Sequence, residues 1–227
     1  AQYLRRAGGR NVSVVYNGVQ TVESSDARGP EAGKSGAPTG QDAAGAGKSG
    51  AEAGQSAAQA HAAAGSSPTK TILYAGNLGR LQSVETLVKA WHAIHDRFPD
   101  WRVRIIGAGV QQDELRQLVT ELGMAENVRL DGVVPKPQAA AAMGEAQILF
   151  LNLLPHPVFD RTIPSKVFDY LSAGKPIVAG IHGEGRDILS SIPANRVFAP
   201  GDAGDLADTL SEMISRIDEL VGLADRN

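Results

Sequence analysis

The hydrophobic positions between Thr71 and Leu220 change their spacing repeatedly, and these changes predict alternating strands and helices. Short runs rich in β-branched and aromatic residues are typical of buried strands. Such runs have the sequences TILYAG, WRVRIIGAG, NVRLDGVV, QILFLNLL, PIVAGI and RVFAPG. Between them, apolar residues recur at helical spacing. We expect helices over residues 84–98, 115–122, 137–146 and 186–190, and in the stretch TIPSKVFDYLSAGKP (162–176). Ser83 is the expected cap of the first of these helices. One long final helix is expected over residues 206–220.

Strands that alternate with helices through short connections form a parallel sheet with helices on both faces. The predicted fold is therefore α/β, with a Rossmann-like sheet. In such sheets, ligands bind beyond the carboxyl ends of the strands. Most of these ends are rich in glycine, and they lie at residues 76–80, 107–109, 132–135, 154–166, 181–186 and 200–202. Backbone amides and helix dipoles make such a rim suitable for a ligand with phosphate groups.

The first 68 residues differ in composition from the rest of the chain. Residues 1–23 contain one predicted strand, 12–16, which is closed by an Asn-Gly turn. Residues 24–68 contain no Phe, Trp or Tyr and no aliphatic residue larger than alanine. Such a segment cannot bury enough apolar surface to offset the entropy of ordering. We therefore expect a joining segment (1–23), a flexible insert (24–68) and a ligand-binding domain (69–227).

The overall composition disfavours several functional classes. The 227 residues include 22 Lys plus Arg and 25 Asp plus Glu, so the basic excess of a typical nucleic-acid-binding protein is missing. There is no cysteine, which removes disulfide and thiolate chemistry and suits the cytoplasm. No apolar run approaches the roughly 20 residues of a membrane span, and the N-terminus does not have the layout of a signal peptide. Since the chain does not begin with methionine, we expect it to be part of a longer protein.

The stretch TIPSKVFDYLSAGKP combines charge and helix start in an unusual way. Pro164 and Ser165 lead into a short helix, Lys166 places a cation in its first turn, and Asp169 follows one turn later. The amides and Lys166 could hold a diphosphate, while Asp169 could accept hydrogen bonds from ribose hydroxyls. Alternatively, Lys166 and Asp169 could form an exposed i,i+3 ion pair worth a few tenths of a kcal/mol. The position at a strand's carboxyl end favours the first interpretation.

Glycine-containing turns supply further candidate contacts. In AGNLGRLQS, Gly76 and Gly79 permit close backbone approach and Arg80 could meet a phosphate. A plain strand-to-helix turn with a surface arginine explains the same residues. The runs IIGAG (105–109) and HGEGRD (182–187) each offer a Gly-x-Gly turn. Neither completes the GxGxxG dinucleotide fingerprint, which disfavours a Rossmann dehydrogenase.

Other polar residues give weaker signals. Glu184 lies at the tip of the second turn, where it could reach a sugar hydroxyl or simply be solvated. His92 and His95 lie i,i+3 on one predicted helix, but no carboxylate or cysteine cluster supports a metal site there. No G-x-S-x-G elbow supports a serine hydrolase.

Taken in order, these motifs resemble the C-terminal half of a family 4 glycosyltransferase, a retaining enzyme with the GT-B fold. The segments that carry the resemblance are VSVVYNGV, ILYAGNLGRLQSVETLVKA, VRIIGAGVQQDELRQL, NVRLDGVVP and DYLSAGKPIVAGIHGEGRDIL. Together they cover almost all of the chain except the insert. The patterns AGNLGRLQ and IPSKVFDY also resemble bacterial transferases that add amino-deoxy sugars, such as N-acetylfucosamine, during cell-surface polysaccharide assembly.

The sequence departs from the family pattern around the phosphate. Where the family has a pair of glutamates, this chain has Arg161 and Asp169. The basic pair of the family's first strand-to-helix turn is replaced by Asn77 and Gln82. Positive charge at the site is therefore expected from Lys166, Arg161 and Arg80.

The resemblance implies a role for each matching residue. A nucleotide-sugar, with uridine as the expected base, would bind without a metal or other cofactor, because amides and cations would stabilise the leaving diphosphate. Lys166 and Glu184 are implied to act in catalysis. The implied donor-binding residues are Gly76, Asn77, Gly79, Arg80 and Gly107 in the first turns, Gly132, Val133 and Val134 beside the base, Arg161, Pro164, Ser165, Lys166 and Asp169 at the diphosphate and ribose, and His182, Gly183 and Glu184 at the sugar.

The resemblance also implies a partner. The acceptor site of the family lies on an N-terminal half, so we expect this chain to require that half, to bind the donor weakly and to turn nothing over alone. The longer enzyme is expected in the cytoplasm, with peripheral membrane contact through the other half. Two alternatives stay open: a nucleotide-sugar epimerase of the same fold, and a non-catalytic nucleotide-binding module.

Overall fold

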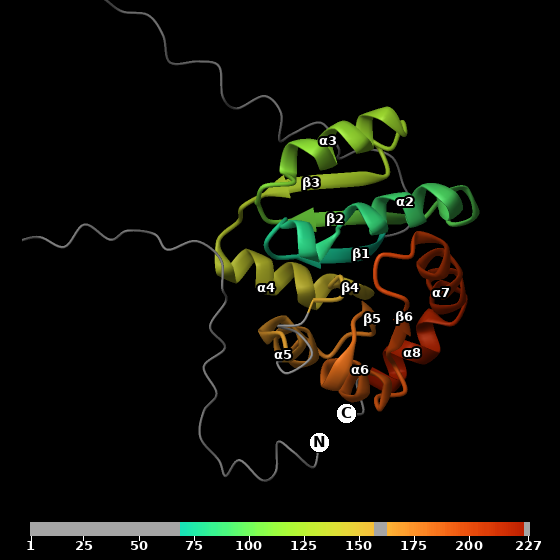
Figure 1. The fold of residues 1–227 in the computed structure, drawn as a ribbon. Coiled ribbons are helices and arrows are strands. Elements are labelled where there is room, and N and C mark those ends of the chain that lie inside the picture. The colour runs from blue at the N-terminus through green and yellow to red at the C-terminus, as the bar shows by residue number, and fades with distance from the viewer. Residues whose placement is uncertain (1–68, 157–162, 225–227) are drawn as a thin grey trace, which may run out of the picture. The chain divides into compact units, whose positions relative to one another are not determined.

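The computed structural model describes residues 69–156 and 163–224. Their strands form one parallel sheet in the order β3-β2-β1-β4-β5-β6 (Figure 1). The strands are β1 (Lys70–Ala75), β2 (Trp101–Ile106), β3 (Val128–Gly132), β4 (Ile148–Asn152), β5 (Ile177–Gly180) and β6 (Arg196–Phe198). All six strands that the hydrophobic runs predicted in this region are confirmed. The order runs outward from β1 to β3 and then from β4 to β6, so the winding reverses between β1 and β4.

Helices cover both faces of the sheet, as predicted (Figure 1). One face carries α2 (Glu85–Ile94), α3 (Gln112–Glu121), α7 (Ala203–Ser215) and α8 (Ile217–Ala224). The other face carries α4 (Lys136–Glu145), α5 (Ser165–Ser172) and α6 (Gly183–Ser190). Two short 3-10 helices, η1 (Arg80–Gln82) and η2 (His95–Arg97), flank α2.

Alternate residues of each strand supply the two cores. On β1, Ile72 and Tyr74 belong to the core beneath α2 and α7, and Leu73 belongs to the core beneath α4, α5 and α6. All three side chains are fully buried. Burial on both faces explains why β4 and β5 read as near-continuous apolar runs, whereas β2 and β3 keep arginines at alternate, less buried positions. It also supplies the main stabilisation, at roughly 25 cal/mol per Å² of apolar surface.

The start of α2 differs from its prediction. Ser83 does not cap the helix with its side chain: the hydroxyl donates to the carboxylate of Glu85 and contacts the hydroxyl of Thr86. Its backbone is left-handed, with φ 41°, an uncommon conformation for a residue other than glycine. Only Ser83 and Val84 join η1 to α2, and Ser83 ends η1 in the left-handed conformation.

Two helix boundaries were also wrong. α6 begins at Gly183, so HGEGRD is the first turn of a helix and not a free Gly-x-Gly turn. The predicted final helix divides at Arg216, whose φ is −118°. The break lets Ile217 and Leu220 of α8 stay in the same core as α7.

No helix within the described part of the chain is long and apolar enough to cross a lipid bilayer. The predicted strand at 12–16, the insert at 24–68 and the candidate Arg161 lie outside the described residues.

Candidate functional site

The carboxyl ends of β1 and β4 separate in the middle of the sheet. β1 pairs with β2 along its whole length, whereas its ladder with β4 joins only Ile72 to Ile148 and Leu73 to Leu149. Open α/β sheets bind ligands in the crevice where the strand order reverses. The candidate site is therefore built from the loop after β1 and from α5, which follows β4.

Lys166 of α5 reaches across this opening. Its ammonium donates a hydrogen bond to the carbonyl oxygen of Ala75, the last residue of β1. It also lies 5.3 Å from the ring centre of Tyr74 and 5.6 Å from that of Tyr170, within the range of cation–π attraction. Burial lowers the pKa of Lys166 from 10.5 to about 8, although the charge of Asp169 opposes this shift. Lys166 forms no ion pair with any residue that the structure describes, so its charge is available to an anionic ligand.

Asp169 lies one turn further along α5 and is only 7% exposed. Burial raises the pKa of its carboxyl group, and the charge of Lys166 offsets part of that rise. The alternative of an exposed Lys166–Asp169 ion pair is therefore wrong: Asp169 is buried, and the ammonium of Lys166 bonds to a backbone carbonyl instead. The packing of α5 on the sheet decides this, because Val167 and Tyr170 bury one side of the helix in the core.

Three of the predicted glycines meet at the ends of β1, β2 and β3. The N–H of Gly76 donates to the oxygen of Ile106 at 2.8 Å, and the N–H of Gly107 donates to the oxygen of Gly132 at 2.7 Å. Gly107 has a φ of 138°, and a Cβ there would overlap the carbonyl of Gly76. A Cβ on Gly76 would in turn overlap the ammonium of Lys166. Close packing of these loops thus requires glycine, and their contact with a ligand stays a prediction.

The remaining predicted residues occupy the same edge of the sheet. The exposed ones are Asn77, Arg80, Val133, Ser165, His182, Gly183 and Glu184, and the half-buried ones are Gly79, Val134 and Pro164. The starts of α5 and α6 approach each other, since the Cδ of Pro164 lies 3.8 Å from the position of a Cβ on Gly185. The edge therefore offers the predicted groups, and their contacts with a ligand stay predictions.

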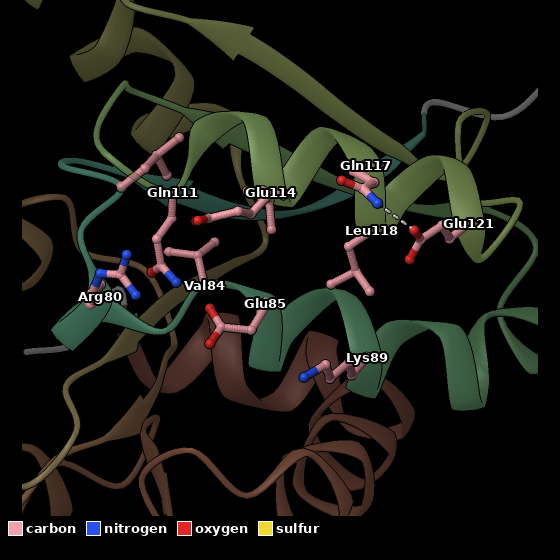
Figure 2. A pocket seen from close by; sticks show the side chains of 11 residues that line it. Arg80, Val84, Glu85, Lys89, Gln111, Glu114, Gln117, Leu118 and Glu121 are labelled. Carbon is pink, nitrogen blue, oxygen red and sulfur yellow. Dashed lines mark hydrogen bonds between the residues drawn. The ribbon is translucent and has the colours of Figure 1, made fainter.

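A hollow of about 320 Å³ lies elsewhere, between α2 and α3 (Figure 2). Arg80 and Gln111 lie at one end of it, and at the other Gln117 donates a hydrogen bond of 2.7 Å to Glu121. Arg80 is the only predicted site residue in its lining, which mixes cations with carboxylates. Because Lys166 is not part of it, we place the candidate site at the β1–β4 opening.

Sequence reasoning missed the groups that surround Lys166. The hydroxyl of Tyr170 accepts the N–H of Ala75 at 2.9 Å, and the hydroxyl of Tyr74 donates to the oxygen of Asn77 at 2.5 Å. In the sequence both tyrosines resemble ordinary core residues. The available signal was their hydroxyl groups, because a buried phenol normally finds a hydrogen-bond partner.

Asn152 was also missed. It is fully buried at the end of β4. Its amide nitrogen donates to the oxygens of Gln82 and Ser83 at 3.2 and 3.3 Å, and its amide oxygen accepts the N–H of Gly201 at 3.2 Å. It thus ties the β1–α2 and β6–α7 loops to β4. A polar residue at the end of the apolar run ILFLN was the available signal, since buried amides need partners.

Within residues 69–156 and 163–224, no group of three or more His, Asp or Glu side chains is placed to hold a metal ion. The expected independence from metals stays a prediction.

Comparison with known proteins gives a consistent result. The sequence model of a family described as "Glycosyl transferases group 1" matches residues 69–216. An uncharacterized glycosyltransferase of Haemophilus influenzae is 27% identical over 110 residues, which are 48% of this chain and 29% of that protein. A D-inositol 3-phosphate glycosyltransferase of Corynebacterium glutamicum is 26% identical over 117 residues, which are 49% of this chain and 27% of that protein. A putative colanic acid biosynthesis glycosyltransferase of Salmonella typhimurium is 25% identical over 119 residues, which are 52% of this chain and 29% of that protein.

The chain spans less than a third of the length of these three relatives. Solved structures give the same fold. Anabaena HepE in complex with UDP and glucose has a TM-score of 0.57 at 20% identity, over 69% of this chain and 42% of that one. The C-terminal domain of LpcC, a glycosyl transferase group 1 family protein of Francisella tularensis, has a TM-score of 0.59 at 17% identity. The match covers 68% of this chain and 80% of that one. At these identities the likeness establishes the fold alone.

Proposed function

The chain belongs to the group 1 glycosyltransferase family, and from this premise we propose that it forms the donor-binding half of a retaining glycosyltransferase. The donor would be a nucleoside diphosphate sugar. The observation that carries this proposal is the ammonium of Lys166, which lies at the end of β1 with no ion-pair partner among the described residues. A diphosphate would supply the missing negative charge through a charge-assisted hydrogen bond.

The surroundings of Lys166 suit the rest of such a ligand. Lys166 lies in the first turn of α5, where the leading backbone amides have no partner within the helix and favour anions. Asp169, one turn later, is assigned to the ribose hydroxyls, because a carboxylate can accept two hydrogen bonds at once. We assign Gly132, Val133 and Val134 at the end of β3 to the base.

Uridine diphosphate is the proposed nucleotide. HepE, which has the same fold, was solved in complex with UDP and glucose. The patterns AGNLGRLQ and IPSKVFDY support an amino-deoxy sugar as the transferred group. The similarity to a putative colanic acid biosynthesis enzyme supports a role in cell-surface polysaccharide assembly.

In the proposed reaction, Lys166 stabilises the charge that develops on the leaving diphosphate. Glu184 is exposed in the first turn of α6 and is assigned to the donor sugar. The acceptor would be bound by another part of the longer protein, so this chain alone should bind the donor without transferring the sugar.

Isothermal titration of the 227-residue chain with UDP tests the proposal. Lys166→Ala should weaken UDP binding by about tenfold or more, because a hydrogen bond to a charged group is worth roughly 1.5–3 kcal/mol. Lys175→Ala is the matched control, since Lys175 follows the other end of α5 and precedes β5 at the amino edge of the sheet. Equal affinity of Lys166→Ala and the wild type would sink the assignment of this site.

Titration with ADP, GDP and CDP tests the base, and titration with UDP-glucose, UDP-N-acetylglucosamine and UDP-N-acetylfucosamine tests the sugar. Preference for a nucleotide other than UDP would redirect the donor assignment. Formation of an epimer from the donor by the longer protein, with no acceptor present, would favour an epimerase over a transferase.

A further inference from the structure

Both backbone polar groups of Ala75 face the side of β1 where β4 should pair. Earlier on that side, the N–H of Thr71 donates to the side-chain oxygen of Gln147 at 2.6 Å, and its carbonyl accepts the N–H of Gln147 at 3.0 Å. Because alternate residues of a strand face the same neighbour, Ala75 faces the same way as Thr71. The ladder between the strands, however, ends at Leu73 and Leu149.

Two side chains of α5 take the place of β4 at this position. The hydroxyl of Tyr170 accepts the N–H of Ala75 at 2.9 Å, and the ammonium of Lys166 donates to the carbonyl of the same residue. Tyr170 is only 1% exposed. Residues 166 and 170 lie i,i+4 and therefore on one face of the helix. A single helical face thus binds both backbone groups of the last residue of β1.

We propose that Tyr170 is a positioning residue for binding of the nucleoside diphosphate. Its hydroxyl fixes the separation between α5 and the end of β1, and so places the ammonium of Lys166 beside Gly76. This inference rests on the proposed function, because it concerns the same diphosphate site.

The argument depends on how little freedom the ammonium has. A Cβ on Gly76 would overlap it, so a small shift of α5 changes its place relative to the loop after β1. A phenylalanine at position 170 would keep the ring beside the ammonium but would leave the N–H of Ala75 without its partner. An unpaired buried amide is unfavourable, so the contact between α5 and β1 should loosen to admit water. Lys166, which is bound to the carbonyl of the same Ala75, would then lose its fixed position.

The test is a double-mutant cycle on the full 227-residue chain, with UDP as the probe and NMR titration as the readout of weak affinities. We expect Tyr170→Phe to weaken UDP binding about threefold to tenfold, a fraction of the loss from Lys166→Ala. In the Lys166→Ala background, Tyr170→Phe should change UDP binding by less than about twofold, because coupled residues are not additive.

Ser172→Ala is the matched control, because it removes a hydroxyl from the same helix whose hydrogen bond stays within α5. It should leave UDP binding unchanged. Urea unfolding of each variant establishes that it is folded. Gly76→Ala is a second variant that displaces the ammonium without touching Tyr170, and it should weaken UDP binding more in the wild-type background than in the Lys166→Ala background.

The outcomes separate the two proposals. If Tyr170→Phe binds UDP like the wild type, or weakens binding equally with and without Lys166, Tyr170 does not act through Lys166 and this inference is overturned. Unchanged UDP binding by Gly76→Ala overturns it as well, because the placement of the ammonium would then be irrelevant. In these cases the donor site stands. If Lys166→Ala binds UDP as tightly as the wild type, the proposed donor site fails, and this inference fails with it.

Discussion

Replacing Lys166 by methionine should stabilise the fold and weaken nucleotide binding in the same protein. Methionine fills a similar volume without a charge. Burial of the Lys166 ammonium without a counter-ion among the described residues disfavours the folded state, whereas the same ammonium favours a bound diphosphate. The substitution therefore separates the stability of the fold from its proposed function.

The magnitude follows from the lowered pKa. Burial moves the pKa of Lys166 from 10.5 to about 8, which at about 1.36 kcal/mol per unit corresponds to roughly 3 kcal/mol. Since the folded-state pKa is the lower one, the unfolded chain binds the extra proton between about pH 8 and 10.5. The free energy of unfolding of the wild type should therefore rise with pH in that window. Below about pH 8 the buried, charged Lys166 lowers this free energy by the full amount. Loss of the charge-assisted hydrogen bond to Ala75 opposes the gain by roughly 1.5–3 kcal/mol, so we expect a net gain of at most about 2 kcal/mol near pH 7.

Urea unfolding from about pH 7 to 10 measures this difference, with the fluorescence of Trp91 and Trp101, both buried in the core, as the signal. The advantage of Lys166→Met should shrink by about 2–3 kcal/mol over that range. Burial raises the pKa of Tyr74, but this effect is common to both proteins and cancels in the difference. Lys175→Met is the control for removal of a positive charge next to α5.

A difference between Lys166→Met and the wild type that is independent of pH would refute the reasoning. It would mean that the Lys166 ammonium is hydrated in the folded protein and is not desolvated by its contact with β1. Loss of stability at pH 7 together with the expected slope would instead mean that the hydrogen bond to Ala75 outweighs the burial of the charge.

The remaining predictions concern the same edge of the sheet. UDP affinity, measured by isothermal titration, should fall as the pH rises through about 8, because Lys166 then loses its proton, and this dependence should disappear in Lys166→Ala. Gly107→Ala should lower the free energy of unfolding in urea by about 3 kcal/mol or more, because the φ of Gly107 is 138° and the added Cβ would overlap Gly76. A loss below about 1 kcal/mol would contradict the close approach of Gly107 to the carbonyl of Gly76. Asn152→Ala should lower the same free energy by about 2–4 kcal/mol, since it removes the hydrogen bonds to the carbonyls of Gln82 and Ser83 and from the N–H of Gly201. A neutral effect would show that water replaces the amide.

The sequence by itself determined the architecture of the described region. Each predicted run became a strand, and β4 and β5 are apolar nearly throughout because they are buried on both faces. The helix over 137–146 was predicted within one residue of α4, since its bounds depend on local signals such as Pro137. Alternation of the elements then left a parallel sheet with helices on both faces as the consistent solution. The same logic located the ligand edge, because the ends of the strands can be read directly.

Only the tertiary structure decided what surrounds Lys166. Its hydrogen bond to Ala75 joins residues 91 positions apart, and that of Tyr170 joins residues 95 positions apart. These contacts exist because β1 and β4 are neighbours that diverge at their carboxyl ends. Divergence of strands leaves no local mark in a sequence. From spacing alone, Lys166 and Asp169 fit an exposed ion pair equally well. The packing of α5 removed that alternative, because it buried Asp169 and gave the half-buried ammonium of Lys166 a carbonyl partner in place of the carboxylate.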